Sequence, residues 1–404
     1  MDAPTPKAKK KHLQAHAPQP LRKTHLGIAR PPFECIALVL QGGGALGAFQ
    51  AGVYQGLAEA NLHPDWVAGI SIGAINAALI AGNAPEKRVE KLQAFWDRIT
   101  HPMFPGSFEI GKKFVMGDVQ RRLWNQMHSA HALLYGAPGF FTPRMMPPFF
   151  YPPGTREATS YYDTANLRGT LEELVDFDRI NSDTMRFSVG SVNIRTGNFV
   201  YFDSRTHDIR PEHILASGAL PPGFPPIEIE GELYWDGGLV SNTPLQWVTS
   251  GDSRQDTLTF QVDLWSSRGE APRDLPDVMV RQKEIQYSSR TRANTDQFKM
   301  IQRARFALAN VLEKLPPELM DSEDVELLRS VADRKVYQIV QLIYRSRHYE
   351  AQSKDYDFSH LSMKEHWELG YTDAIRTLRH PEALARPSDR TGVGTFDLGV
   401  NGRE

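Results

Sequence analysis

The hydrophobic pattern of the N-terminal part of the chain alternates between short apolar runs and longer segments with helical spacing. Cys35–Leu40 (CIALVL) and residues 66–70 are continuous apolar runs, which predict strands buried on both faces. Each run precedes a segment that predicts a helix, at residues 48–58 and 74–79, and Arg88–Ile99 again shows helical spacing. This alternation of strands and helices is typical of an α/β fold with parallel strands.

Further strands are predicted downstream. Residues 185–192 and 198–202 alternate apolar and polar side chains, and residues 195–197 (Arg-Thr-Gly) between them are typical of a hairpin turn. Residues 233–235 form a short predicted strand, and residues 257–264 form the last convincing one. Asp263, near the end of that strand, is a candidate for a structural rather than a catalytic role.

After about residue 270 the pattern changes to charged segments that we interpret as helices, at residues 278–309, 325–331, 336–345 and 358–379. The sequence therefore predicts a three-layer α/β sandwich with a mainly parallel central sheet, followed by a helical C-terminal region. The predicted division is a disordered basic tail over residues 1–31, an α/β domain over 32–268, the helical region over 269–385 and a tail over 386–404.

The composition excludes several classes of protein. A net charge of -2 argues against a nucleic-acid binder. The single cysteine, Cys35, lies in a predicted buried strand, so no disulfide forms within the chain, as is compatible with a reducing cytosol. No apolar stretch of about 20 residues is present, so no membrane span is predicted. The expected location is the cytoplasm.

The N-terminal tail is basic, with Lys7, Lys9, Lys10, Lys11, Arg22 and Lys23. No apolar segment of the secretory type follows these residues, so the tail is not a secretory signal. Two interpretations stay open: a solvated tail without a role, and a peripheral contact with an anionic inner-membrane surface.

The second predicted strand ends in a candidate nucleophile. Gly69-Ile70-Ser71-Ile72-Gly73 has the G-x-S-x-G spacing that exposes a serine hydroxyl on a tight turn between strand and helix. Ser71 would then lie at the N-terminus of the following helix, where the dipole favours a developing negative charge. Because short patterns of this kind occur by chance, an ordinary tight turn is the alternative.

The first predicted strand leads into a glycine loop with Gly42, Gly43, Gly44 and Gly47. Backbone N–H groups of such a loop, at a helix N-terminus, can bind a phosphate or stabilise an oxyanion. The G-x-G-x-x-G spacing also suggests dinucleotide binding, which requires an acidic residue at the end of the second strand. Asp65 lies before that strand, and no Gly-Lys-Ser/Thr follows the glycines, so both nucleotide interpretations are weaker.

A third motif lies far downstream, at Asp236-Gly237-Gly238. Asp-Gly alone is a common turn pair, and a turn is the alternative interpretation. Together, however, the three motifs resemble those of the patatin-like phospholipase family, in the same order and spacing. Asn242 and Pro244 also match, as does the segment 216–226 (ASGALPPGFPP), and the likeness covers roughly residues 34–250.

The resemblance implies a lipid acyl hydrolase domain over residues 32–268 that needs no metal or cofactor. Ser71 is then the nucleophile, Asp236 is the base, and Gly42, Gly43, Gly44 and Gly47 form the oxyanion loop. Gly69, Gly73, Gly237 and Gly238 complete the motifs. The expected substrate is a lipid or another acyl ester, and the oligomeric state is left open. The alternatives are a non-catalytic lipid-binding or scaffold protein and a dinucleotide-dependent oxidoreductase.

Three features depart from this scheme or extend it. Many family members carry Arg or Lys where this chain has Leu46, which puts a side-chain contact to an anionic head group in doubt. Residues 133–154 are rich in Pro, Phe and Met, and predict either a loop packed on the core or a lid over an acyl-chain entrance. A Ser-Asp-His triad would need a histidine after Asp236, and the candidates are His348, His360, His366 and His380.

Overall fold

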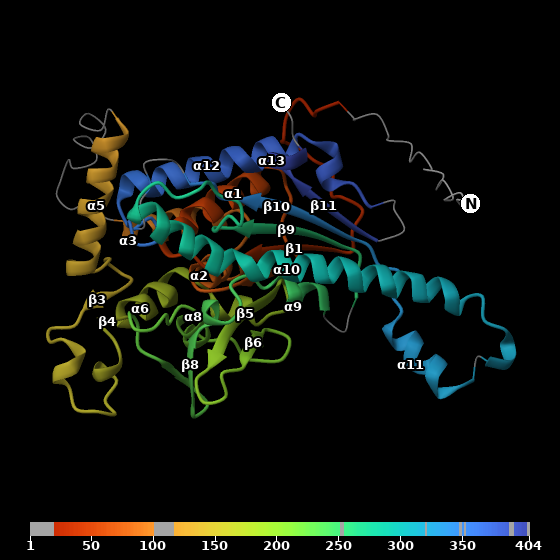
Figure 1. The fold of residues 1–404 in the computed structure, drawn as a ribbon, viewed down its shortest axis with the longest axis horizontal. Coiled ribbons are helices and arrows are strands. Elements are labelled where there is room, and N and C mark those ends of the chain that lie inside the picture. The colour runs from red at the N-terminus through yellow and green to blue at the C-terminus, as the bar shows by residue number, and fades with distance from the viewer. Residues whose placement is uncertain are drawn as a thin grey trace, which may run out of the picture.

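A nine-stranded mixed sheet lies at the centre of this computed structural model (Figure 1). The structure describes residues 20–100, 117–250, 254–319, 321–346, 350, 353–387 and 392–401. The strands are β1 (Cys35–Leu40), β2 (Trp66–Gly69), β5 (Arg186–Asn193), β6 (Phe199–Asp203), β7 (Ile227–Ile229), β8 (Glu232–Asp236), β9 (Thr257–Asp263), β10 (Tyr337–Ile343) and β11 (Val393–Asp397).

The strand order is β11-β10-β9-β1-β2-β5-β8-β7, and β6 pairs with β5. All neighbours from β11 to β5 are parallel, whereas β6, β7 and β8 pair antiparallel. Strands β1 and β9 are buried along their whole length, as expected for strands covered on both faces. The mainly parallel sheet predicted from the continuous apolar runs is confirmed.

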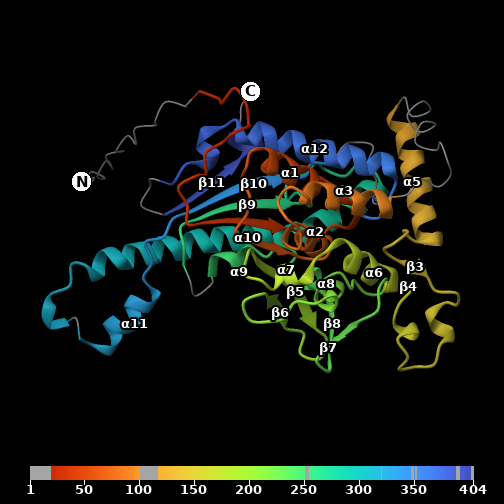
Figure 2. The same ribbon diagram turned by 180° about the vertical axis from the view of Figure 1, so that it is seen from behind.

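Helices cover both faces of the sheet, as the two opposite views show (Figures 1 and 2). One face packs in the main core with α1 (Ala48–Glu59), α2 (Ile72–Ala81), α3 (Arg88–Ile99) and α12 (His360–Leu378). The other face packs against α9 (Leu245–Ser250) through Val248 and against α10 (Leu275–Leu312) through Phe298. The chain is therefore a three-layer α/β sandwich, as predicted.

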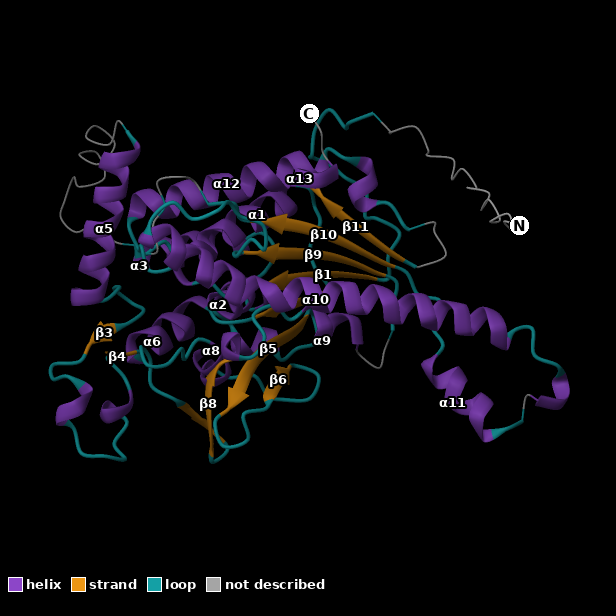
Figure 3. Cartoon of the chain, viewed as in Figure 1, coloured by secondary structure: helices purple, strands orange, loops and turns teal. Residues whose placement is uncertain are grey.

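The remaining elements lie around this sandwich (Figure 3). They are α5 (Asp118–Tyr135), α6 (Ala165–Leu174), α7 (Phe177–Ile180), α8 (Pro211–Ser217), α11 (Glu323–Val331), α13 (Leu398–Asn401) and the strand pair β3 (Thr142–Pro143) and β4 (Tyr162–Asp163). None of the helices in the described ranges combines the length and the apolar character needed to cross a membrane.

The C-terminal region contains the predicted helices but is not only helical. Residues 336–345 were expected to form a helix, and that expectation is wrong, because Tyr337–Ile343 is the strand β10. The segment is rich in β-branched residues and is buried against β9, where extended backbone is favoured. The tail expected over residues 386–404 is also corrected, since Val393–Asp397 forms β11 and pairs with β10.

The C-terminal region is packed tightly against the rest of the domain. α12 lies across α1, and a Cβ on Gly52 would come within 1.9 Å of the Trp367 carbonyl oxygen. A Cβ on Gly370 would come within 2.0 Å of the Phe49 carbonyl oxygen, so both helices use glycine to bring their backbones together. All motif residues precede residue 250 and so lie outside this region. The shared sheet and this helix contact show that the region is part of the same folded unit.

The basic tail predicted over residues 1–31 is described only in its second part. Residues 1–19 of the basic tail lie outside the described residues, and residues 20–31 form no regular helix or strand. Arg22 in this stretch donates hydrogen bonds from its backbone N–H to the Arg379 carbonyl and from its side chain to the Leu378 carbonyl.

Cys35 is a buried free thiol, as expected, and burial raises its pKa to about 12.

Candidate active site

Ser71 lies on a sharp turn between β2 and α2. Its backbone has φ 56° and ψ -123°, a conformation that side-chain-bearing residues rarely adopt, and its side chain is half-buried. The turn is tight, because a Cβ on Gly69 would come within 2.2 Å of the Gly73 carbonyl oxygen. The Ser71 N–H donates to Ser217 Oγ over 3.1 Å, and this hydroxyl donates to the Gly190 carbonyl. These contacts hold the serine on its predicted elbow.

Asp236 ends β8 and faces this serine. Its carboxylate accepts a hydrogen bond from the Gly238 N–H, whose nitrogen lies 2.7 Å from Oδ1. Only 2% of the residue is exposed, and burial raises the pKa of the carboxyl to about 7, although the neighbouring Ser71 side chain and the Gly238 N–H lower it. A carboxylate with such a pKa is a stronger base than one in water.

The sheet register explains how residues 165 positions apart in the sequence come together. β5 pairs with β2 through Val189, opposite Gly69, and with β8 through Ser191, opposite Asp236. The last residue of β2 and the last residue of β8 are therefore aligned to positions only two residues apart on β5. Ser71 follows two residues after Gly69, which brings its hydroxyl within reach of Asp236.

The glycine loop follows β1 and lies beside the serine. A Cβ on Gly42 would come within 3.1 Å of the Ser71 Cβ. The Gly42 carbonyl accepts hydrogen bonds of 2.9 Å from Asn242 Nδ2 and from Trp265 Nε1, and its N–H donates to the Asn242 carbonyl. Gly44 adopts φ 57°, where a side chain would also overlap the Asp355 carbonyl oxygen.

Two N–H groups of this loop are available to a ligand. Within the described residues, neither the Gly43 nor the Gly44 N–H donates a hydrogen bond to a protein acceptor. The Ala45 N–H, in contrast, donates to the Asp355 carbonyl over 2.8 Å. Gly47 contributes close packing, since a Cβ there would come within 2.5 Å of Ile72 Cγ1.

Comparison with known families decides what kind of domain carries this arrangement. A family model described as patatin-like phospholipase matches residues 38–249, which include the glycine loop, the serine elbow and Asp236. This chain belongs to the patatin-like phospholipase family. A second model, described as patatin phospholipase, matches residues 285–390, so the C-terminal region of this patatin-like protein also matches a patatin model.

Other comparisons add little detail. VipD from Legionella pneumophila is a similar solved structure, at 14% sequence identity and a TM-score of 0.37. The match covers 95% of this chain and 77% of the VipD chain. No curated protein sequence matches the patatin-like chain.

Several residues that support the glycine loop were not recognised in the sequence. Gln41 is fully buried, and its Oε1 accepts hydrogen bonds from the backbone N–H groups of Leu264 and Trp265. A polar residue directly between an apolar run and three glycines was the available signal for Gln41. Asp355 gave no such signal, because it lies in the C-terminal region. Its carboxylate accepts two hydrogen bonds from Lys283, of 2.8 and 2.9 Å.

The histidines considered for a triad contact other groups. His366 is buried and pairs with Glu350, with 3.3 Å between Nε2 and Oε1. His380 pairs with Glu382, and His360 lies 3.4 Å from the Thr100 hydroxyl. His348 lies outside the described residues. No hydrogen bond between Ser71 and a histidine is present in the described part of the chain.

The dinucleotide interpretation also finds no support in the geometry. Asp65 precedes β2 and accepts a hydrogen bond of 2.7 Å from the Ile36 N–H, near the start of β1. It also pairs with Arg30. Its carboxylate therefore lies at the amino ends of the parallel strands, whereas the glycine loop lies at their carboxyl ends.

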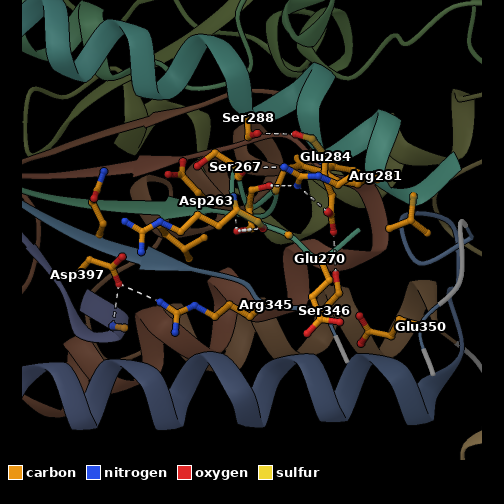
Figure 4. A pocket seen from close by; sticks show the side chains of 18 of the residues that line it. Asp263, Ser267, Glu270, Arg281, Glu284, Ser288, Arg345, Ser346, Glu350 and Asp397 are labelled. Atoms are coloured by element: carbon orange, nitrogen blue, oxygen red, sulfur yellow. Dashed lines mark hydrogen bonds and ion pairs between the residues drawn. The ribbon is translucent and has the colours of Figure 1, made fainter. Parts of the chain in front are cut away.

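A separate cavity of about 800 Å³ lies near the carboxyl ends of β9, β10 and β11 (Figure 4). Neither Ser71 nor Asp236 lines it. Asp263 does line it, and burial raises the pKa of this carboxyl to about 7 although Gln261 and Thr243 donate hydrogen bonds to it. Within the described residues Asp263 has no serine beside it, so a raised pKa alone does not distinguish Asp263 from Asp236, whereas the nearby Ser71 side chain does.

Proposed function

We propose that this patatin-like protein hydrolyses acyl esters in lipids with Ser71 and Asp236 as a catalytic dyad. One observation carries the proposal: the register of β5 brings Ser71 beside Asp236, a buried carboxylate whose pKa is raised to about 7. A serine becomes a useful nucleophile when an adjacent base accepts its proton, and Asp236 would act as that base. Membership of the family supports the lipid substrate.

The reaction would proceed in two steps. Ser71 Oγ attacks the ester carbonyl carbon while Asp236 takes the hydroxyl proton, and the Gly43 and Gly44 N–H groups stabilise the oxyanion. The intermediate collapses, the alcohol leaves with the proton from Asp236, and the acyl group stays on Ser71. Water then attacks the acyl-enzyme, again with Asp236 as base, which releases the fatty acid and restores the serine.

Leu46, at the loop position where many family members carry Arg or Lys, does not select the lipid head group. The Leu46 side chain is fully buried in the core, so it offers no contact to a substrate. The structure therefore supports recognition of the ester and its acyl chain rather than of an anionic head group at this position.

The proposal is tested by incubating the protein with phospholipids, triacylglycerols and p-nitrophenyl esters and measuring the released fatty acid by mass spectrometry. Fatty acid should accumulate with the wild type and not with Ser71→Ala. A folded wild type that binds these lipids without releasing fatty acid would favour a non-catalytic lipid-binding protein instead.

The rate should depend on pH through Asp236. Its carboxyl must be ionised to accept the serine proton, and burial raises its pKa to about 7. We therefore expect kcat/KM for a neutral ester to fall about tenfold per pH unit below pH 7 and to level off near pH 8. A pH–rate profile between pH 4 and 9 measures this. A rate that stays constant down to pH 5 would show that the base is an ordinary exposed carboxylate.

A further inference from the structure

The glycine loop of the candidate active site is held from outside by the C-terminal region. The Asp355 carbonyl accepts a hydrogen bond of 2.8 Å from the Ala45 N–H. It also lies against Gly44, where an added Cβ would come within 2.1 Å of the carbonyl oxygen. Gly44 adopts φ 57°, a conformation that glycine reaches easily but does not by itself prefer. The contact with Asp355 therefore supplies a constraint that a run of glycines lacks.

Asp355 lies in a segment of irregular backbone, residues 353–359, which precedes α12 and belongs to no helix or strand. Because no helix or sheet fixes this backbone, side-chain contacts decide where the Asp355 carbonyl lies. One contact is made by Phe358, whose ring centroid lies 5.8 Å from those of both Phe140 and Phe141. These two residues belong to the Pro/Phe/Met segment, and they are buried in the core.

Helix α10 holds the 353–359 segment through two ion pairs. Lys283 Nζ donates to both carboxylate oxygens of Asp355, over 2.8 and 2.9 Å, and lies 5.2 Å from the centre of the Tyr356 ring. The next residue of the helix, Glu284, accepts a hydrogen bond of 2.8 Å from Lys354, whose side chain is only 2% exposed. Consecutive residues of α10 thus bind consecutive residues of the segment. We call Lys283 and Asp355 the clamp pair.

Elements next to the clamp pair contact the other part of the loop and the candidate base. Trp265 Nε1 donates to the Gly42 carbonyl over 2.9 Å, and the Trp265 ring packs on Tyr287 of α10 with 5.2 Å between centroids. Burial raises the pKa of the Tyr287 hydroxyl, and the charges of Asp236 and Asp355 raise it further. The clamp pair and the catalytic carboxylate are therefore both within electrostatic range of Tyr287.

The clamp pair lies outside the part of the chain that carries the motifs. The patatin-like phospholipase model matches residues 38–249, which include neither Lys283 nor Asp355. Asp355 falls within the second matched range, residues 285–390, and Lys283 lies just before that range. The motif-bearing part therefore does not contain the side chains that hold its own glycine loop.

We propose that Lys283 and Asp355 are positioning residues for the proposed hydrolysis, on which this inference rests. Their ion pair keeps the Asp355 carbonyl on the Ala45 N–H. That contact in turn holds the Gly43 and Gly44 N–H groups where the oxyanion forms. Donors that are fixed before the reaction stabilise the developing charge without rearrangement, and a loop without the clamp must be ordered in each turnover. Both residues act through the loop rather than on the ester itself.

Steady-state kinetics of the full-length chain with p-nitrophenyl butyrate tests the proposal. Lys283→Met and Asp355→Asn each remove the ion pair and leave the Asp355 backbone carbonyl in place. We expect kcat to fall about 10- to 100-fold with KM within about twofold, because a misplaced oxyanion donor weakens the transition state and not ester binding. Lys283→Arg should restore most of the activity, since a guanidinium also binds a carboxylate through two hydrogen bonds.

A double variant shows whether the two residues act through one contact. If they do, Lys283→Met combined with Asp355→Asn should lose no more than about twice what the more impaired single variant loses. Losses that multiply would show two independent effects and would overturn the clamp pair.

The Lys335–Glu34 ion pair provides a matched control, because it also joins the C-terminal region to the N-terminal strands. Lys335 Nζ lies 2.7 Å from both carboxylate oxygens of Glu34. Glu34 directly precedes β1, so this pair lies at the end of the strand away from the glycine loop. Lys335→Met should leave kcat within about threefold of the wild type. An equal loss in Lys335→Met and Lys283→Met would mean that both act through the stability of the fold, which would overturn the positioning role.

Hydrogen–deuterium exchange gives a readout that does not depend on activity. A peptide that contains Ala45 should exchange at least about tenfold faster in Lys283→Met than in the wild type, because its N–H loses a fixed acceptor, and should be unchanged in Lys335→Met. Unchanged exchange in Lys283→Met, or faster exchange with unchanged kcat, would overturn the proposal. A wild type that hydrolyses no ester, while exchange at Ala45 still accelerates in Lys283→Met, would overturn the proposed function and leave the clamp pair as the element that fixes the loop.

Discussion

Ser71→Ala should lower kcat for p-nitrophenyl and phospholipid esters by roughly 10⁴–10⁶-fold, because it removes the attacking oxygen. Folding should be unaffected, since the hydroxyl is half-buried and the turn is held by backbone contacts. Steady-state kinetics on purified protein, with circular dichroism as a check on folding, measures the effect.

Ser191→Ala is the matched control for this prediction. Ser191 lies opposite Asp236 in the sheet, and its hydroxyl has no hydrogen-bond partner within the described residues. Like Ser71→Ala, this variant removes a serine hydroxyl from a residue that neighbours Asp236. We expect kcat to stay within about threefold of the wild type, because a hydroxyl that contacts no substrate adds nothing to transition-state binding. Equal losses in the two variants would mean that the Ser71 effect reflects local packing rather than chemistry.

Asp236→Asn should lower kcat by about 10²–10⁴-fold, because the amide cannot accept the serine proton. Asp263→Asn is the control, since burial raises the pKa of both carboxyls to about 7 and the Ser71 side chain affects the pKa of Asp236 but not that of Asp263. Asp263→Asn should retain most of the activity. A large loss of activity in Asp263→Asn with little loss in Asp236→Asn would show that Asp236 is not the base.

The thermal unfolding temperature of Asp236→Asn tests the raised pKa of Asp236 without relying on activity. The folded-state pKa of Asp236 is raised above its unfolded value, so this group stabilises the fold least above pH 7, where a buried charge must be maintained. The Asn variant should therefore unfold at a higher temperature than the wild type at pH 8. The difference should shrink as the pH falls below 7 and disappear below about pH 4, where the carboxyl is protonated in both states.

Histidine variants distinguish the dyad from a triad. His360, His366 and His380 have partners other than Ser71, and alanine at each should leave most of the esterase activity. His348 is included because it lies outside the described residues. A single folded histidine variant as inactive as Ser71→Ala would require a triad in place of the dyad.

The parts of the fold that the sequence predicted well are those with a local signal. The runs at Cys35–Leu40 and Trp66–Gly69 are strands because they are continuously apolar, and the glycines after each allow the tight turns that place the loop and Ser71. β10 was missed because its neighbour in the sheet, β9, is distant in sequence. Pairing with β9 decides the conformation of residues 337–343, and local propensity does not.

The motifs of the site could be predicted from the sequence, but the residues that hold those motifs in place could not. Ser71 and Asp236 were identified from short patterns and a resemblance, and the register of β5 supplies the reason that they meet. The Asp355 carbonyl, which occupies the Ala45 N–H, could not be anticipated, because no motif links positions 310 residues apart. Because this contact occupies the Ala45 N–H and the Gly42 N–H donates to the Asn242 carbonyl, Gly43 and Gly44 are left as the candidate oxyanion donors in this part of the loop.

A fluorophosphonate probe tests the central claim most directly, because it reacts with an activated serine and leaves a covalent phosphonyl group on the attacking oxygen. The wild type should be modified at Ser71, as mapped by peptide mass spectrometry at pH 8. Asp236→Asn should react at least about 100-fold more slowly, since its base is lost. Modification of another residue with Ser71 unmodified, or equal rates in the wild type and Asp236→Asn, would contradict the dyad.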